Sequence, residues 1–174
     1  MPNVPLSHIY GDSNFTRFYI IHKNKSHTAE YVKLLQQLWR DKDILIVEGK
    51  YSRLGVGNDL FDNVKSIKRI LCPCKNAFDH YDAILQQTIS AADGRLVVLA
   101  LGMTATVLAY DLSNKGIRAL DLGHIDVEYE WFRMGARQKV AIPGKHVNEV
   151  EGGLSQIPLI DETYLSQIIA TIDD

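Results

Sequence analysis

The fold is decided by two apolar runs: residues 44–47 are Ile-Leu-Ile-Val, and residues 96–101 are Leu-Val-Val-Leu-Ala-Leu. A strand with one face in solvent alternates polar and apolar residues. Runs that are apolar throughout therefore indicate strands buried on both faces, as in parallel sheets. The longer run has six residues, whereas about 20 are needed to span a bilayer. We therefore expect two central strands of a parallel sheet and no transmembrane segment.

Helical and strand-like segments alternate along the rest of the chain. In chain order we expect a helix at 29–40, strand 44–47, a short helix at 58–64, strand 67–72, helix 78–91, strand 96–101, helix 104–114, strand 117–122, a helical or extended stretch at 126–134, and a helix at 162–172. This alternation predicts an α/β fold, a Rossmann-like parallel sheet with helices on both faces. Residues 1–28 show no period and are expected to be an irregular segment preceding a single domain at 29–174.

The composition is that of a near-neutral globular protein. The 174 residues include 19 Lys plus Arg and 21 Asp plus Glu, which gives a net charge of −2 and a pI of about 6.3. Such a chain lacks the basic field that supports nucleic-acid binding. Cys72 and Cys74, with one residue between them, fit neither a disulfide scaffold nor a zinc motif. With no signal-peptide pattern in the first 25 residues, we expect a protein of the reducing cytoplasm.

The loops that follow the predicted strands are where a site is expected, because ligands of parallel sheets bind outside the carboxyl ends of the strands. Residues 102–106, Gly-Met-Thr-Ala-Thr, lead directly into a predicted helix. The first N–H groups of that helix can bind a phosphate, with Thr104 and Thr106 adding hydroxyls. A simple turn at Gly102 with Thr104 as a helix cap explains the same residues equally well, and the dinucleotide-binding glycine motif is absent.

The loop after residue 47 is rich in glycine and hydrogen-bond donors. Gly55 and Gly57 lie close to Ser52, Arg53 and Asn58, a set that can bind an anionic ligand. The sequence is not a P-loop. An ordinary solvated loop is the simpler interpretation of these residues taken alone.

The loop after residue 122 contains two carboxylates separated by one residue. In an extended segment, Asp126 and Glu128 would point the same way and could hold a divalent cation that neutralises a leaving diphosphate. Either of them, or His124, could instead deprotonate an acceptor hydroxyl. The carboxylates could also simply cap or pair at a helix start, and the residues alone favour this last interpretation.

Taken together, these loops carry a family resemblance. The relevant stretches are 47–63 (VEGKYSRLGVGNDLFDN), 76–82 (NAFDHYD), 99–102 (LALG), 104–112 (TATVLAYDL) and 121–132 (DLGHIDVEYEWF). In this order they resemble bacterial glycosyltransferases of the GT-D fold, and the likeness runs from about Ser13 almost to the C-terminus. Met103 stands where the family usually has a proline. The sequence carries no Arg-Phe-Gly-Asp-Gly-Glu motif, so it resembles the C-terminal part of the family domain.

The resemblance implies a transferase that moves a sugar from a nucleotide donor, typically UDP, to a glycan or glycoprotein acceptor of the bacterial surface. It also implies a divalent metal, Mn²⁺ or Mg²⁺, near the diphosphate. The nucleotide-sugar contacts that it implies are Ser52, Arg53, Asn58, Asp59, Gly102, Thr104 and Thr106. His124, Asp126 and Glu128 are implied beside the reacting centre as catalytic candidates, with Asp126 and Glu128 also as metal ligands.

The alternative is an accessory GT-D domain that retains nucleotide binding without catalysis. Because the acidic family motif is absent from this sequence, we expect low activity unless a partner supplies it. We also expect a homo-oligomer, or a complex with a partner glycosyltransferase, since uncovered strand edges favour association.

Overall fold

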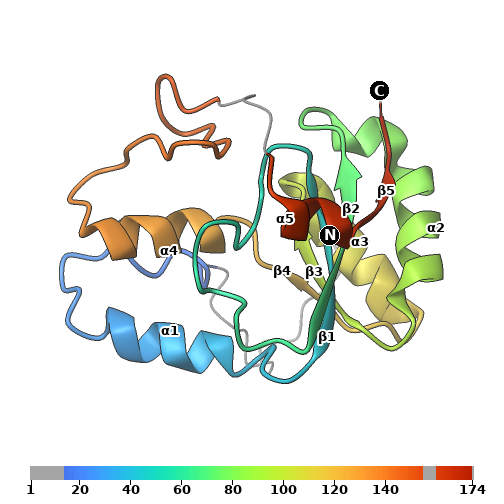
Figure 1. The fold of residues 1–174 in the computed structure, drawn as a ribbon, viewed down its shortest axis with the longest axis horizontal. Coiled ribbons are helices and arrows are strands. Elements are labelled where there is room, and N and C mark those ends of the chain that lie inside the picture. The colour runs from blue at the N-terminus through green and yellow to red at the C-terminus, as the bar shows by residue number, and fades with distance from the viewer. Residues whose placement is uncertain (1–13, 155–159, 174) are drawn as a thin grey trace, which may run out of the picture.

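The computed structural model describes residues 14–154 and 160–173, which form a five-stranded parallel sheet with helices on both faces (Figure 1). The strand order is β4-β3-β1-β2-β5. In chain order the elements are α1 (Thr28–Gln36), β1 (Asp43–Gly49), β2 (Ser66–Cys72), the 3-10 helix η1 (Ala77–His80), α2 (Tyr81–Ala92), β3 (Leu96–Ala100), α3 (Met103–Asn114), β4 (Ala119–Asp121), α4 (Ile125–Met134), α5 (Glu162–Gln167) and β5 (Ile168–Thr171).

The two apolar runs are adjacent parallel strands at the centre of the sheet, as predicted. Strand β1 pairs with β3 on one side, with Ile44 opposite Leu96, and with β2 on the other, with Ile44 opposite Ile67. The side chains of residues 44–47 are completely buried. The predicted Rossmann-like α/β class is therefore confirmed.

Each face of the sheet carries its own hydrophobic core because successive strand residues point to opposite faces. Ile44 and Ile46 pack on the face covered by α1 and α4. Leu45 and Val47 pack on the face covered by α2 and α3. Figure 1 shows the two helix pairs on opposite sides of the sheet. Because helices cover both faces of these strands, a ligand can reach them only at their ends.

The segment before α1 packs against α4. Phe18 and Tyr19 are buried in the core that α1 and α4 share. The backbone N–H groups of Tyr19 and Ile20 donate to Glu128 Oε2 of α4, at 2.9 and 2.8 Å. Residues 14–27 are thus irregular in backbone, with Phe18 and Tyr19 buried and residues 21–27 mostly exposed, whereas residues 1–13 lie outside the described part of the chain.

Three predicted helices differ from the structure. The helix predicted at 29–40 ends at Gln36 and is followed by turns. Residues 58–64 form consecutive turns, not a helix: the Asn58 side-chain oxygen accepts from the N–H of Leu60 at 3.0 Å, a local bond that competes with helix formation. The predicted helix at 162–172 ends at Gln167. Residues 168–171 become β5, because the open edge of β2 offers their backbone a parallel partner.

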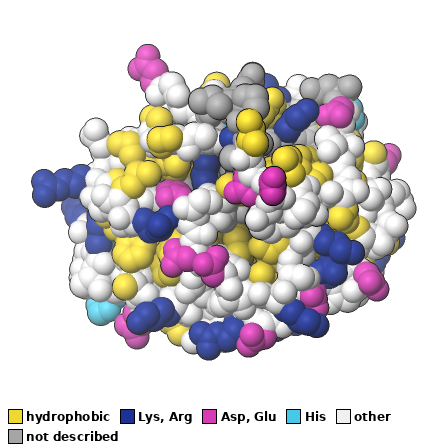
Figure 2. Space-filling view, viewed as in Figure 1, with side chains coloured by type: hydrophobic (Ala, Val, Ile, Leu, Met, Phe, Trp, Pro, Cys, Tyr) yellow, Lys and Arg dark blue, Asp and Glu magenta, His cyan; other side chains and the backbone are white. Residues whose placement is uncertain are grey.

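The charge distribution agrees with the near-neutral composition. On the face shown in Figure 2, basic and acidic side chains alternate with apolar ones and do not form a field of one sign. In the described residues, no helix has both the length and the apolar character needed to cross a membrane.

Candidate functional site

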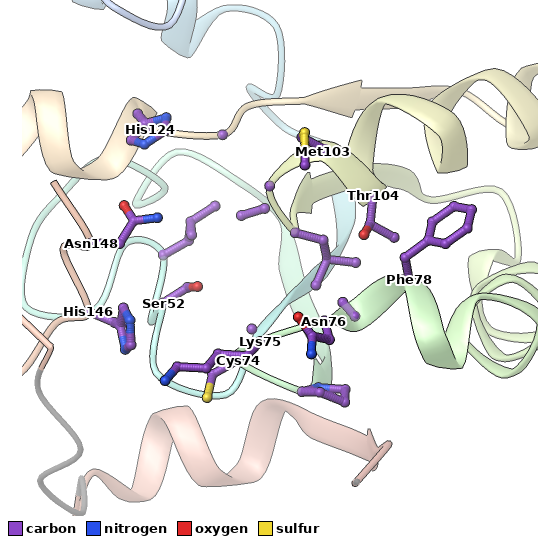
Figure 3. A pocket seen from close by; sticks show the side chains of 18 of the residues that line it. Ser52, Cys74, Lys75, Asn76, Phe78, Met103, Thr104, His124, His146 and Asn148 are labelled. Atoms are coloured by element: carbon purple, nitrogen blue, oxygen red, sulfur yellow. The ribbon is translucent and has the colours of Figure 1, made fainter.

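A cavity of about 860 Å³ opens at the carboxyl ends of the strands. Its walls come from the segments that follow all four of β1, β2, β3 and β4, joined by residues 146–148 of the loop after α4 (Figure 3). Of the residues predicted for the site, those that line it are Ser52, Gly102, Thr104, His124 and Asp126. The strand-end rule therefore located the cavity correctly.

The β3–α3 turn contributes a helix N-terminus to this cavity. Gly102 precedes α3 with φ 56° and ψ −139°, a conformation that only glycine adopts readily. A Cβ placed on Gly102 would meet nothing within 4 Å, so the backbone borders open space. No side chain caps the helix. The N–H of Ala105 donates to the carbonyl of Gly102, so the N–H groups of Met103 and Thr104 are those available to an anionic ligand.

Helix α4 begins at the cavity, with His124 as its N-cap residue. The Nε2 atom of His124 lies 2.7 Å from Oε1 of Glu149. Burial, together with the charge of Arg17, lowers the pKa of His124 below its ordinary value, and the negative charges of Glu149 and Glu128 oppose this only in part. The lowered pKa favours the neutral imidazole, the form that can accept a proton.

Asp126 lies at the cavity wall but is fully engaged inside the protein. Its Oδ1 accepts from the N–H of Gly55 at 2.9 Å and from the side-chain amide of Asn58 at 2.8 Å. Its Oδ2 accepts from Lys145 Nζ at 2.6 Å. Only 2% of the residue is exposed. This carboxylate therefore holds the loop after β1 and the loop after α4 against α4.

The pairing expected for Asp126 and Glu128 is wrong, because residues 125–134 form a helix and not an extended segment. Residues two apart on a helix do not face each other. Glu128 is completely buried, accepts the N–H groups of Tyr19 and Ile20, and lies 3.7 Å from Arg17. The two carboxylates thus have separate structural partners and do not fit a shared divalent cation. No group of three or more metal-binding side chains occurs in the described residues.

The other predicted contact residues, Arg53, Asn58, Asp59, Thr106 and Glu128, do not line this cavity, and their role toward a nucleotide sugar stays a prediction. Arg53 is buried and donates from Nη1 to the carbonyl of Gly144 at 2.5 Å. Asn58 supports Asp126, as described above. Asp59 accepts from the hydroxyl of Tyr129, and Thr106 donates to Asp121 Oδ2, each at 2.8 Å. These contacts are internal: Arg53 joins two loops, Asn58 and Asp59 join a loop to α4, and Thr106 joins α3 to β4.

The loop after β2, together with the first residues of η1, is the largest part of the cavity wall that residue-level reasoning missed. Residues 73–79 all line the cavity, and they include the exposed Lys75 and Phe78. Figure 3 shows Asn76 and Phe78 on the side of the cavity opposite His124 and His146. The strand-end rule had already indicated this loop, and the NAFDHYD stretch at 76–82 was a second signal.

The loop after α4 supplies the remaining functional candidates, Lys145, His146 and Glu149. His146 stacks on Tyr51 with ring centroids 6.4 Å apart, and burial lowers its pKa. No periodicity marks this loop. Its contacts with Asp126 and His124 arise only once the chain is folded, so no sequence pattern indicated them.

A buried ion pair fixes the backbone of the loop after β1. Arg69 Nη1 of β2 donates to Glu48 Oε1 of β1 at 2.6 Å, and both side chains are almost fully buried. Glu48 Oε2 accepts from the N–H of Leu54, and Arg69 Nη2 donates to the carbonyl of Leu54. Leu54 lines the cavity. The pair therefore sets the position of one cavity wall.

Comparisons with known proteins agree with this geometry. A family model described as glycosyltransferase GT-D fold matches residues 3–150. A solved domain of unknown function 1792, described as having a distinct glycosyltransferase fold, superposes with a TM-score of 0.92 at 47% identity, covering 98% of this chain and 62% of that one. A structure described as a new glycosyltransferase from Streptococcus sanguinis gives a TM-score of 0.89 at 50% identity, covering 94% of this chain and 61% of that one.

Two curated relatives are named as glycosyltransferases. The chain is 50% identical to a probable glycosyl transferase, Gly, of Streptococcus gordonii, and 46% identical to the glycosyltransferase GlyD of Streptococcus pneumoniae. Each match covers 94% of this chain but only 24% and 20% of those proteins. The chain thus spans a quarter or less of these relatives. It belongs to the GT-D fold glycosyltransferase family.

Proposed function

We propose that this domain binds a nucleotide-sugar donor, with UDP as the nucleotide, and transfers the sugar to a glycan acceptor of the bacterial surface. The observation that carries the proposal is the uncapped N-terminus of α3, which opens at Gly102 onto a cavity of about 860 Å³. A cavity of this size accommodates a nucleotide sugar. A helix N-terminus is suited to the diphosphate, because N–H groups and the helix dipole both favour negative charge.

Different walls of the cavity then have different roles. The first turn of α3 binds the diphosphate, and the exposed Lys75 lies on the same cavity to pair with phosphate oxygens. In transfer, the acceptor oxygen forms a bond to the anomeric carbon while the bond from that carbon to the diphosphate breaks. The acceptor hydroxyl loses its proton, and the neutral His124 is the group at the cavity that accepts it.

The divalent metal implied by the family would neutralise the leaving diphosphate. Asp126 and Glu128 do not fit it as a shared pair, since Asp126 is engaged by Lys145 and Glu128 Oε2 by two backbone N–H groups, while Glu128 Oε1 lies 3.7 Å from Arg17. The step above accordingly uses this chain's own residues alone.

Calorimetric titration with UDP tests the binding proposal. We expect saturable binding by UDP and binding at least roughly tenfold weaker by uridine, which lacks the diphosphate, a difference of about 1.4 kcal/mol. Equal affinity for UDP and uridine, or no binding of UDP, would contradict a diphosphate site at α3. Repeating the titration with MnCl₂ measures whether a metal contributes to binding.

The accessory-domain alternative is favoured by one observation, the engagement of Asp126 and Glu128 in structural contacts. Donor hydrolysis and sugar transfer with and without manganese separate the two functions. Turnover of a UDP-sugar supports the enzyme, whereas UDP binding without any turnover supports an accessory nucleotide-binding domain.

A further inference from the structure

Three segments far apart in the sequence meet around one carboxylate at the edge of the cavity. Glu149, in the loop after α4, has its Oε1 2.7 Å from Nε2 of His124. The same oxygen accepts from Arg17 in the segment before α1, and Oε2 accepts from Lys139. Because a cation holds each oxygen, the carboxylate has a defined position next to the imidazole.

The 2.7 Å contact between Nε2 of His124 and Oε1 of Glu149 is an ion-pair contact within hydrogen-bonding distance. A carboxylate only accepts, so a neutral His124 can hydrogen-bond to it only with the proton on Nε2. The lone pair then resides on Nδ1 of a ring that lines the cavity. A hydrogen bond at this contact would fix both the orientation of the ring and the nitrogen that can take a proton.

The charged groups that face His124 come from every element around it. Arg17 belongs to the segment before α1, Glu128 to α4, and Lys139 and Glu149 to the loop after α4. Of these, Glu149 is the one whose oxygen contacts the ring nitrogen. Glu128 instead accepts the N–H groups of residues 19 and 20.

We infer that Glu149 is a positioning residue, which accepts Nε2–H of His124 and thereby directs Nδ1 to act as the base toward the acceptor hydroxyl. This inference rests on the proposed function, in which His124 accepts the proton. Glu149 itself touches neither donor nor acceptor in this arrangement and acts through the imidazole. When the acceptor is deprotonated, its proton passes to Nδ1, and the carboxylate stabilises the resulting imidazolium.

The first test reads the hydrogen bond without using activity. A proton on Nε2 that is bonded to a carboxylate exchanges slowly with water and gives a downfield proton NMR signal, assigned by its loss in His124→Ala. We expect this signal in the unmodified protein, its loss in Glu149→Ala, and its retention in Glu151→Ala. Glu151 is the matched control, an exposed glutamate two residues further along the same loop.

The second test is a double-mutant cycle on transfer or donor hydrolysis. Glu149→Ala is expected to lower kcat roughly 100-fold, the lower end of the range for general base catalysis, with KM for the UDP-sugar nearly unchanged. Glu149→Asp should recover part of kcat. In the His124→Ala background, Glu149→Ala should cause no further loss, because the two residues act as a unit.

Several outcomes would overturn the inference. One is an Nε2–H signal that persists in Glu149→Ala or is absent from the unmodified protein. Another is an additive loss of kcat in the double variant. Thermal unfolding of each variant identifies any variant that has lost its fold. In that case the presence or absence of the Nε2–H signal in the unmodified protein still tests the inference. Absence of turnover in the unmodified protein would instead count against the proposed function, and the NMR result is independent of it.

Discussion

Nζ of Lys145 lies 2.6 Å from Oδ2 of Asp126, and both residues are buried. Lys145 also donates to Glu130 Oε1 at 3.3 Å. A residue of the loop after α4 thus supplies the cation for the carboxylate that the sequence suggested as a metal ligand. The Lys145 ammonium therefore pairs with the carboxylate for which the family resemblance implies a divalent metal ion.

Removing Lys145 should strongly destabilise the fold. Lys145→Met leaves the buried carboxylate of Asp126 without its cation, at a cost of about 3 kcal/mol in the free energy of unfolding. Lys65→Met removes an exposed partner of Asp43 and should cost less than about 1 kcal/mol. Urea unfolding measures both, and equal losses would contradict the importance of the buried pair.

A methyl group at Gly102 should block the diphosphate site. Gly102→Ala places a Cβ in the open space before α3 at φ 56°, and Gly116→Ala makes the same change at φ 75° beyond the other end of the helix. Each should cost about 1 kcal/mol of stability, because alanine is strained at positive φ. Only Gly102→Ala should weaken UDP binding, by roughly tenfold. Calorimetry of the two variants checks this, and matching affinities would remove the turn from the site.

Arg53 and Lys75 should respond differently to salt. Lys75 is exposed at the cavity, so the loss of UDP affinity in Lys75→Met should shrink as ionic strength rises. Arg53 donates to the carbonyl of Gly144, so Arg53→Met should lower stability by about 2 kcal/mol. Any loss of UDP affinity in Arg53→Met should be the same at all salt concentrations. A strongly salt-dependent loss would place the guanidinium on the ligand after all.

The Glu149 carboxylate should make the fold sensitive to acid. Burial opposes its ionisation, but hydrogen bonds from Arg17 and Lys139 outweigh this and hold its pKa at about 2, against an ordinary value of 4.5. The unfolded chain therefore takes up the proton first. The stability that Glu149 contributes is complete above pH 4.5 and disappears as the pH falls toward 2.

Glu149→Gln lacks this titration. Its free energy of unfolding should therefore vary less between pH 5 and pH 2.5 than that of the unmodified protein. Denaturant unfolding across this range measures both slopes. Identical slopes would show that the carboxylate has no special stabilisation in the folded state.

The central strands could be predicted from the sequence because their short, wholly apolar runs fit only a strand buried on both faces. Residues 44–47 and 96–101 are too short for core helices and contain no polar position. Strand β5 could not be predicted, since residues 168–171 become a strand only by pairing with β2, about 100 residues earlier in the chain. The sequence leaves 126–134 open between helix and extended strand, because Asp126 and Glu128 also fit the alternation of a strand; the structure has the helix Ile125–Met134.

In the site, too, the residues set by local sequence could be predicted, whereas those brought in by long-range contacts could not. Gly102, Thr104 and His124 follow strands directly, so the strand-end rule placed them at the cavity. For Arg53, nothing local in the sequence indicates that its side chain contacts the carbonyl of Gly144, 91 residues away. Lys145 and Glu149 belong to a loop with no period, and only the folded chain brings them to Asp126 and His124.

The pairing of β5 with β2 has a consequence during synthesis on the ribosome. Ile70 lies opposite Ala170, so the outer edge of β2 stays unpaired until about 100 further residues have been synthesised. At 5–20 residues per second, that delay lasts at least about 5 seconds. Throughout it, the nascent chain exposes a row of unpaired backbone groups to neighbouring chains. The growing polypeptide is therefore most prone to aggregate before β5 emerges.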